Sequence, residues 1–562
     1  MMKLDWLDPV GDWNPQLLRE LKGRIKPRNL IISGAISLLG QFVLFMSFLV
    51  QIPQLREDGS LPISSYYCTG GNAYAEYTDR QCLADAAGNL LVDWSRWSLD
   101  LFVALSLIGI IGLLVAGTYL LINDLAQEER RGTLNFIRLS PQSAQSILLG
   151  KILGVPILLY LIALLAIPLH LWSGLTARVP LTLTLSFYGV LGISCLFFYS
   201  ISLLFGLVSS ALGGFQAWLG SGTVFTFLWM AAAKPIMHNS FDWINVFSPA
   251  SILQYLIAAT SVESVSSSFY NSSVEELHWF FLPVGLGILG VGSALVLNYS
   301  LWTYWCWQAL QRKFPNPSKT IFSKRQSYLI VACFEVIIIG FAFAGTQYRQ
   351  LTDSFSVLIA YNFLLFLGLI VALTPQKQAL QDWARYRKQQ VKRKHLLSSS
   401  LVRDLSWGEK SPALVAIALN LAIASTMLVP WIFAQLKGSD KLLALATLAL
   451  TISLILVYAA IAQLVVFMRT QKQGLWMIGT LAAIVIMPPV ILGLLSLNPD
   501  KAPVLWLFTA FPFVAIKDAG IFSTFLAFLG QLSVLTLCTL QTNRQIRKAG
   551  ESASKALLAG VK

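Results

Sequence analysis

The densest group of ionisable residues in the first half of this chain lies between two long apolar runs. The stretch LAQEERRGTLNFIRLSPQSAQSILLGKILG, from Leu125 to Gly154, contains four consecutive charges, Glu128, Glu129, Arg130 and Arg131. Mixed charges of this kind form ion pairs with one another or with a partner, and they do not by themselves make a catalytic pair. Two interpretations follow: a solvated turn at a membrane edge, or a surface that grips another molecule.

No motif in the sequence predicts catalysis. A GxxxxGK[ST] phosphate loop is absent, since the nearest stretch, ILLGKIL, lacks the earlier glycine and the following Ser or Thr. There is no GxSxG nucleophile motif, and no group of Cys, His and carboxylate residues has the spacing of metal ligands. We therefore expect neither an enzyme active site nor a cofactor or metal in this chain.

The composition predicts a membrane protein. Of the 562 residues, 56% are hydrophobic and only 12% are charged, where a typical soluble domain has roughly 25% charged residues. A helix needs roughly 20 consecutive apolar residues to cross a bilayer. Twelve stretches reach or approach this length, which predicts an all-α polytopic fold with about 12 spans. The stretches are 30–52, 99–122, 149–173, 183–207, 213–233, 279–305, 328–348, 353–373, 413–435, 442–468, 475–497 and 520–541.

The distribution of basic residues predicts the orientation. With twelve spans and both termini cytoplasmic, most of the 41 Lys and Arg residues fall in cytoplasmic segments, as the positive-inside rule requires. Anionic lipid headgroups favour the net charge of +14 at that face, so no nucleic acid is needed to explain it. We expect a multi-pass protein of an inner or plasma membrane, in contact with lipid and with no nucleic acid.

The twelve stretches fall into two sets of six, separated by a basic segment from Gln311 to Tyr328. The predicted domains are an amphipathic cytoplasmic lead-in (1–29), a first six-span domain (30–305), a cytoplasmic linker (306–327), a second, degenerate six-span domain (328–541) and a cytoplasmic tail (542–562). A Ser-Pro pair precedes the third span of each set. Six spans per half give both halves the same orientation, which predicts parallel repeats, with chance similarity among apolar segments as the alternative.

The charged stretch itself predicts a short helix that ends at a corner. It contains no proline before Pro141, so the helix of the second span should continue into it, with Leu134, Phe136 and Ile137 on an apolar side. Ser140 should end that helix because it precedes a proline. We also expect Ser140 to cap the next helix, with Pro141 as its first residue.

The order of residues in EERRGTL, RLSP and ILLGK resembles the signature of type-2 ABC transporter permeases, an exporter class. In that family this segment is a coupling helix that docks on an ATP-binding subunit. The resemblance covers about residues 14 to 305, which would make 30–305 a permease domain. Since this chain has no phosphate loop, the resemblance implies a separate ABC ATP-binding subunit, in two copies. The positions that match the motif are Glu128, Glu129, Arg131, Gly132, Thr133, Leu134, Ser140, Pro141, Gly150 and Lys151.

The second half departs from this pattern. The loop before its third span, Thr374 to Pro412, keeps Ser411 and Pro412 as a candidate second coupling loop, but it has no Gly-Thr-Leu and is far more basic. If both halves dock an ATPase, one chain and two ATP-binding subunits complete the transporter. If only the first half does, a second permease chain must join.

A secondary transporter driven by an ion gradient is the alternative function. It would need coupled carboxylates within the spans, because a charge in the bilayer is costly unless it is paired or hydrated. Glu335 is the clearest intramembrane candidate; it would either take part in an ion pathway or reach inward to Lys324 or Arg325. His170 is expected to be an interfacial polar residue near the outer end of the third span.

Two of the six cysteines, Cys68 and Cys82, lie together in the outer loop between the first two spans. We expect a disulfide if that side of the membrane is oxidising, and two free thiols are the alternative. The other four cysteines lie in or beside spans, where they are expected to serve as small apolar residues.

Overall fold

The computed structural model describes residues 8–54, 62–70, 80–233, 236–260, 276–343, 348–391, 399–468, 470 and 473–550. The first seven residues of the predicted lead-in and residues 551–562 of the predicted tail lie outside this range. Within it the chain is almost entirely helical, and its sheet is one antiparallel pair, β1 (Ser64–Ser65) and β2 (Arg80–Gln81).

The chain divides into two compact units. The first comprises Met1–Ile236, Ile244–Leu277 and Pro283–Trp307, and the second comprises Met237–Trp243, His278–Leu282 and Gln308–Lys562. The main division therefore falls inside helix α13 (Gly287–Lys313).

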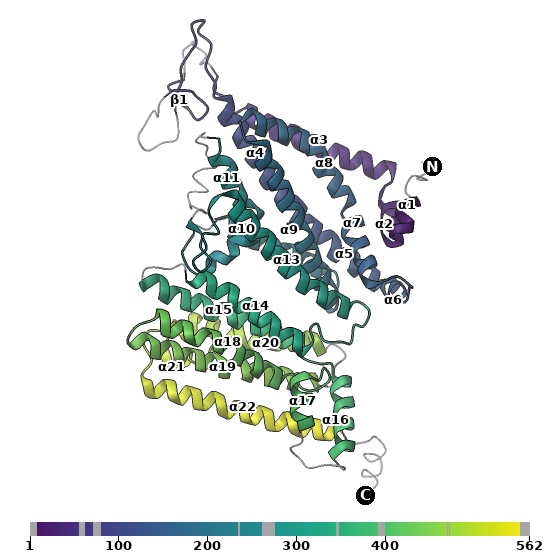
Figure 1. Ribbon diagram of the computed structural model, residues 1–562, viewed down its shortest axis with the longest axis vertical. Helices are drawn as coiled ribbons and strands as arrows, with labels where there is room; N and C mark the ends of the chain where they lie inside the picture. Colours follow the sequence, from purple (N-terminus) through teal and green to yellow (C-terminus); the bar gives the residue numbers. More distant parts are fainter. Residues whose placement is uncertain are drawn as a thin grey trace. The chain divides into compact units, whose positions relative to one another are not determined.

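The first unit is built on long helices that run side by side (Figure 1). Helix α8 packs against both α3 and α4, and α9 packs against α5. The long helices are α3 (Pro27–Leu49), α4 (Trp94–Ile111), α5 (Gly117–Arg130), α8 (Ile157–Thr176), α9 (Leu181–Val208), α10 (Phe215–Ala233) and α13. The shorter elements are α1 (Asp8–Trp13), α2 (Pro15–Arg24), α6 (Thr133–Arg138), α7 (Ala144–Gly154), η3 (Ser210–Leu212), η4 (Ser240–Phe247), η5 (Pro249–Ile252) and α11 (Leu253–Ala258).

The second unit has its own apolar core, centred on α15, α18 and α19. Helix α14 packs on α18, and α19 packs on α15, α18, α20 and α22 (Figure 1). Its helices are α14 (Lys324–Ala342), α15 (Tyr348–Leu373), α16 (Lys377–Val391), α17 (Ser399–Trp407), α18 (Leu414–Gln435), α19 (Ser439–Val466), α20 (Gln473–Leu494), α21 (Pro503–Trp506), η7 (Pro512–Val514) and α22 (Ile521–Ala549).

Ten helices among the described residues are long and apolar enough to span a membrane, so the chain is an all-α polytopic membrane protein as predicted. Two predicted spans, 213–233 and 279–305, correspond to α10 and α13, whose glycine, tryptophan and polar residues keep them out of the ten. The number twelve stays a prediction. The ten are Pro27–Leu49, Trp94–Arg130, Ile157–Thr176, Leu181–Val208, Lys324–Ala342, Leu351–Leu373, Leu414–Gln435, Ser439–Val466, Gln473–Leu494 and Ile521–Ala549.

The span Trp94–Arg130 is one continuous 37-residue helix that contains a π-helical turn, η2 (Gly112–Ala116). A π-turn disturbs the regular backbone hydrogen bonds, and the Tyr199 hydroxyl donates to the Leu113 carbonyl at 2.8 Å. Gly117 leaves room for the Tyr199 ring. The helix therefore continues without a break into its charged end.

Candidate functional site

The predicted coupling segment folds as a corner at the end of α5. Beyond Arg130, Gly132 adopts a left-handed conformation with a φ of 71°, which residues with a side chain enter only at a cost. Thr133 Oγ1 donates to the Glu128 carbonyl at 3.2 Å, and Leu134 is buried. Gly-Thr-Leu thus turns the chain, caps α5 and anchors α6.

Two local predictions for this segment are wrong. The helix of the second span does not continue through the stretch, because Gly132 breaks it. Ser140 and Pro141 do not begin the next helix either, since Ser143 is its N-cap and accepts from the Ser146 N–H at 3.1 Å. Ser140 and Pro141 lie in the loop between α6 and α7, with Pro141 exposed.

The lead-in helix α2 packs closely against α7. A Cβ on Gly150 would lie 2.8 Å from the Leu17 backbone nitrogen, and a Cβ on Gly154 would lie 2.5 Å from the Glu20 Cβ. Asn14 caps α2 by accepting from the Leu17 N–H, and its Nδ2 donates to a carbonyl of α7 at 2.8 Å. Gly150 of the predicted motif is therefore a close-approach residue.

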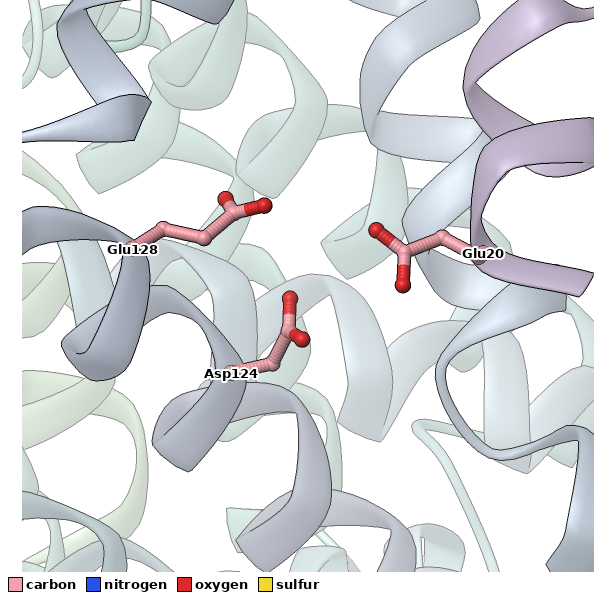
Figure 2. A group of neighbouring side chains, drawn as sticks. All are labelled: Glu20, Asp124 and Glu128. Carbon is pink, nitrogen blue, oxygen red and sulfur yellow. The ribbon is translucent and has the colours of Figure 1, made fainter. Parts of the chain in front are cut away.

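Three carboxylates converge where α2, α5 and α7 meet: Glu20 from α2, and Asp124 and Glu128 from α5 (Figure 2). The Lys151 ammonium of α7 lies 2.7 Å from Asp124 Oδ2, 2.8 Å from Glu128 Oε2 and 3.5 Å from Glu20 Oε1. The Lys151 side chain has no exposed surface. We refer to these four residues as the lysine-carboxylate cluster.

Two arginines of α2 complete the charge balance of the cluster. Arg19 Nη2 donates to Glu128 Oε1 at 2.8 Å, and Arg24 Nη2 donates to Asp124 Oδ1 at 2.6 Å. With Lys151 they provide three positive charges for three carboxylates. Because a buried charge is costly unless it is paired, this balance holds α2, α5 and α7 together.

The carboxylate oxygens of the cluster lie within 4.8 Å of one another, a spacing that could hold a hard cation. Lys151 Nζ lies within 3.5 Å of all three carboxylates, so its ammonium already supplies the positive charge that a bound cation would provide.

Lys151 belongs to helix α7, which is not one of the ten spanning helices. Burial lowers the pKa of this ammonium, but Asp124, Glu128 and Glu20 outweigh burial and raise the pKa above its ordinary value. Lys151 is therefore charged at neutral pH.

Helix α6 presents large apolar side chains to its surroundings. Phe136 is 82% exposed and Leu139 is 85% exposed, and the neighbouring Glu129 and Arg131 are exposed as well. Leu134 and Ile137 are buried, so the prediction that they share one side with Phe136 is wrong. An exposed apolar pair bordered by charges can contact either a protein partner or the membrane surface.

The second candidate coupling loop has a different construction, because Ser411 and Pro412 are buried. Ser411 Oγ donates to the Asp404 carbonyl at 2.6 Å and accepts from Lys324 Nζ at 2.6 Å. Lys324 also donates to the carbonyls of Leu405 and Pro412. Within the described part of the chain no carboxylate lies at ion-pair distance from Lys324. This Ser-Pro pair fastens the end of α17 and offers no surface.

Glu335 is fully buried between α14 and α15. Its Oε2 accepts from Asn362 Nδ2 at 3.4 Å, and it does not reach Lys324, whose ammonium is bonded elsewhere. His170 is also buried, at 5% exposure, and its place at the membrane interface stays a prediction.

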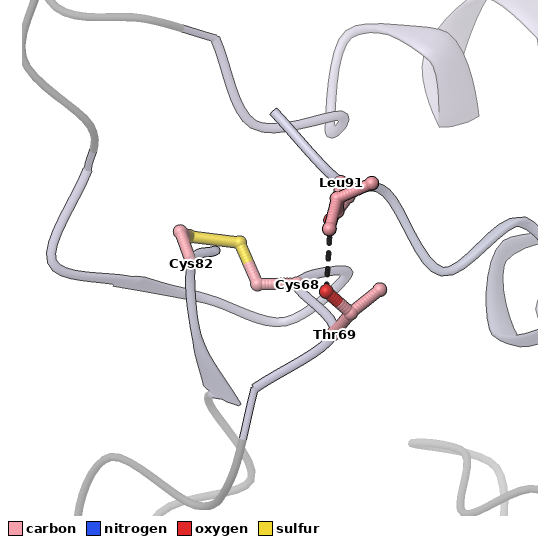
Figure 3. Close-up of a disulfide and its surroundings, with 4 residues drawn as sticks. All are labelled: Cys68, Thr69, Cys82 and Leu91. Carbon is pink, nitrogen blue, oxygen red and sulfur yellow. Dashed lines mark hydrogen bonds between the residues drawn. A yellow bond between two sulfur atoms is a disulfide. The ribbon is translucent and has the colours of Figure 1, made fainter. Parts of the chain in front are cut away.

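Cys68 and Cys82 form a disulfide in the loop between α3 and α4 (Figure 3). Their Cα atoms are 4.8 Å apart, and Thr69 Oγ1 donates to the Leu91 carbonyl at 3.3 Å beside them. The remaining cysteines, Cys195, Cys306, Cys333 and Cys538, carry free thiols.

The structure brings Glu128 and Lys151 together and places Gly132, Thr133 and Leu134 at the corner beside them. Sequence reasoning missed Glu20, Asp124 and the two arginines. The available signal was a lysine inside the apolar run ILLGKILG, because such a lysine needs carboxylate partners. No protein-family model, curated protein or solved structure matches the chain.

Proposed function

We propose that this chain is the membrane-spanning permease subunit of an ATP-driven ABC exporter, coupled to a separate ATP-binding subunit that docks on α6. The observation that carries the proposal is the exposed pair Phe136 and Leu139, held on a corner that the lysine-carboxylate cluster fixes. A force on α6 would pass through this corner into the continuous helix Trp94–Arg130, because no loose loop separates them.

In this proposal α6 faces the cytoplasm, both termini are cytoplasmic and the membrane is an inner or plasma membrane. The disulfide Cys68–Cys82 would then lie in an oxidising compartment on the other side. The two ends of Trp94–Arg130 support this arrangement. The disulfide loop precedes its start and α6 follows its end, so a membrane crossed by this helix separates them.

We further propose that the two units are parallel six-span repeats, because corresponding helices pack in the same pairs. The first span packs on the third in both units, as α3 on α8 and α14 on α18. The second packs on the fourth, as α5 on α9 and α15 on α19. Among the described residues the Ser-Pro pair of the second unit is buried, so this proposal places docking on the corner of the first unit, and two ATP-binding subunits would require a second permease chain.

The ion-driven secondary transporter is the second candidate, and the observation that favours it is Glu335. This carboxylate is buried with one amide hydrogen bond and no ion pair among the described residues. Intramembrane carboxylates of this kind serve proton and ion pathways. A single such group, however, offers no coupled pair.

The test is a purification of the full chain from its native membrane in mild detergent, followed by photolabelling with an azido-ATP analogue. We expect a labelled polypeptide to co-purify with the chain and to hydrolyse ATP. Phe136→Asp combined with Leu139→Asp should reduce the labelled polypeptide at least about tenfold, since charged side chains would replace the apolar centre of the interface.

Val402→Asp is the matched control, because Val402 of α17 is 63% exposed in the second candidate loop. We expect this variant to retain the labelled polypeptide. Recovery of no ATP-binding polypeptide with the wild-type chain, together with transport that stops when the proton or sodium gradient is removed, would establish the secondary transporter instead.

A further inference from the structure

A cavity of about 430 Å³ lies in the first unit between α4, α8 and α9. Its lining is mostly aliphatic and includes Leu105, Ile167 and Leu191. Leu164 also lines it and is 61% exposed, so the cavity opens on the surface of a spanning helix, where lipid is the surrounding medium. Small-molecule sites typically measure about 300–1,000 Å³.

Two glycines border the empty space. A Cβ on Gly109 of α4 or on Gly192 of α9 would meet no atom within 4 Å, whereas a Cβ on Gly174 would lie 2.9 Å from the Phe102 ring. Protein interiors are close-packed and leave few voids of this size. Gly109 and Gly192 both line the cavity and leave this part of it open.

Three polar residues that line the cavity, Tyr188, His170 and Ser106, form a chain of hydrogen bonds, and Tyr160 and Cys195 also line it. Tyr188 OH lies 2.6 Å from His170 Nδ1, and His170 Nε2 lies 2.8 Å from Ser106 Oγ. Ser106 Oγ lies 2.8 Å from the Phe102 carbonyl. The imidazole stacks on the Phe102 ring, with centroids 4.2 Å apart, which fixes its orientation.

The bond from Ser106 to the Phe102 carbonyl fixes which atom donates in the other two bonds. A carbonyl only accepts, so Ser106 uses its proton there and must accept from His170 Nε2–H. His170 Nδ1 is then an acceptor, and Tyr188 donates its only proton to it. Tyr188 lines the cavity, and its oxygen keeps an acceptor site but has no proton left to donate.

We propose that this cavity binds a membrane amphiphile with an aliphatic chain and a hydroxyl headgroup, whose O–H donates to the Tyr188 oxygen. The aliphatic lining takes the chain, and the fixed acceptor selects a donor over a group that can only accept. None of the lining residues belongs to α6 or to the lysine-carboxylate cluster. The site therefore stands whether or not an ATP-binding subunit docks.

The experiment uses the full chain in lipid nanodiscs and two photoreactive probes. One is a long-chain primary alcohol with a diazirine in the chain, and the other is its methyl ether, which has no donor. We expect both to label peptides of α8 and α9, with the alcohol about fivefold more effective at equal concentration. One neutral hydrogen bond of about 1 kcal/mol corresponds to that ratio.

Three variants separate the site from general lipid contact. Gly192→Leu should fill the cavity and reduce labelling at least about tenfold, since the added side chain occupies the ligand's place. Gly189→Leu is the control, because Gly189 lies on the same helix with open space around it and does not line the cavity. Tyr188→Phe should keep labelling by both probes and abolish the preference for the alcohol.

Equal labelling by the two probes in the wild-type chain would overturn the proposal. So would undiminished labelling of Gly192→Leu, or an alcohol preference that persists in Tyr188→Phe. If Gly192→Leu does not fold, the Tyr188→Phe comparison decides, because it removes one oxygen and leaves the cavity walls in place.

Discussion

Each unit buries a lysine near its predicted cytoplasmic side. The partners of one lysine are charged, and those of the other are neutral. Lys151 contacts three carboxylates, while Lys324 donates to two carbonyls and a serine hydroxyl. The first arrangement ties three separate helices together by charge. The second fastens one short helix end to the start of α14.

The Ser-Pro pairs differ in the same way. Pro141 is exposed in a loop that follows the exposed α6, whereas Ser411 and Pro412 are buried under the end of α17. The Ser-Pro dipeptide therefore lies at the surface in the first unit and in the interior in the second. If the units are repeats, as proposed, they share their helix packing and differ at the Ser-Pro corner that follows the second span of each.

Replacement of Lys151 should lower the free energy of unfolding more than any other substitution proposed here. Lys151→Met leaves the three carboxylates of the cluster, of which Glu20 and Glu128 are buried, with only the two arginines, and we expect the free energy of unfolding to fall by about 3–5 kcal/mol. Denaturant unfolding in mixed micelles measures this change. Lys324→Met is the comparison, because it removes a cation that has no carboxylate at ion-pair distance in the described chain. An equal or larger loss in Lys324→Met would break the contrast between the units.

Gly150→Ala should have the next largest effect. Its Cβ would press on the backbone of α2, so we expect a loss of about 1–3 kcal/mol in the free energy of unfolding and faster proteolysis of the lead-in. Gly479→Ala in α20 is the control, because a Cβ there meets nothing within 4 Å. Proteolysis of the lead-in at the wild-type rate would show that the close packing of α2 on α7 is not required.

The two Ser-Pro pairs can be compared directly. Ser411→Ala leaves the Lys324 ammonium without its hydroxyl acceptor, and we expect a loss of about 1–2 kcal/mol. Ser140→Ala should stay within about 0.5 kcal/mol, because Ser140 caps no helix. Thermal unfolding followed by tryptophan fluorescence ranks the two variants. The reverse order would restore Ser140 as the cap of the third span.

Gly132→Ala should destabilise the chain about as much as Ser411→Ala and should also weaken binding of the proposed ATP-binding subunit. The left-handed conformation costs a residue with a side chain about 1–2 kcal/mol, so α6 should shift and the labelled ATP-binding polypeptide should decrease. Gly438→Ala in the second unit is the control, since Gly438 also has a positive φ. We expect it to destabilise the chain without loss of the polypeptide, and equal loss in both would point to general unfolding.

The helical class could be predicted, because apolar runs are local patterns. Of the four consecutive charges, Glu129, Arg130 and Arg131 are exposed, but the burial of Glu128 depends on long-range partners. The cap at Ser143 could not be predicted, because serine is a good N-cap at either 140 or 143. The residue at which α6 ends decides which of the two caps the next helix. The partners Glu20 and Asp124 were also beyond sequence reasoning. They depend on how α2 packs over Gly150 and Gly154, which is a long-range contact.

The most direct test of the central claim is site-specific crosslinking in native membranes. Phe136→benzoylphenylalanine in the first unit and Val402→benzoylphenylalanine in the second would be irradiated and then labelled with an azido-ATP analogue. From position 136 we predict an adduct in which the crosslinked polypeptide also carries the azido-ATP label. From position 402 we predict no such adduct. An adduct from position 402 alone, or none from position 136, would contradict docking on α6.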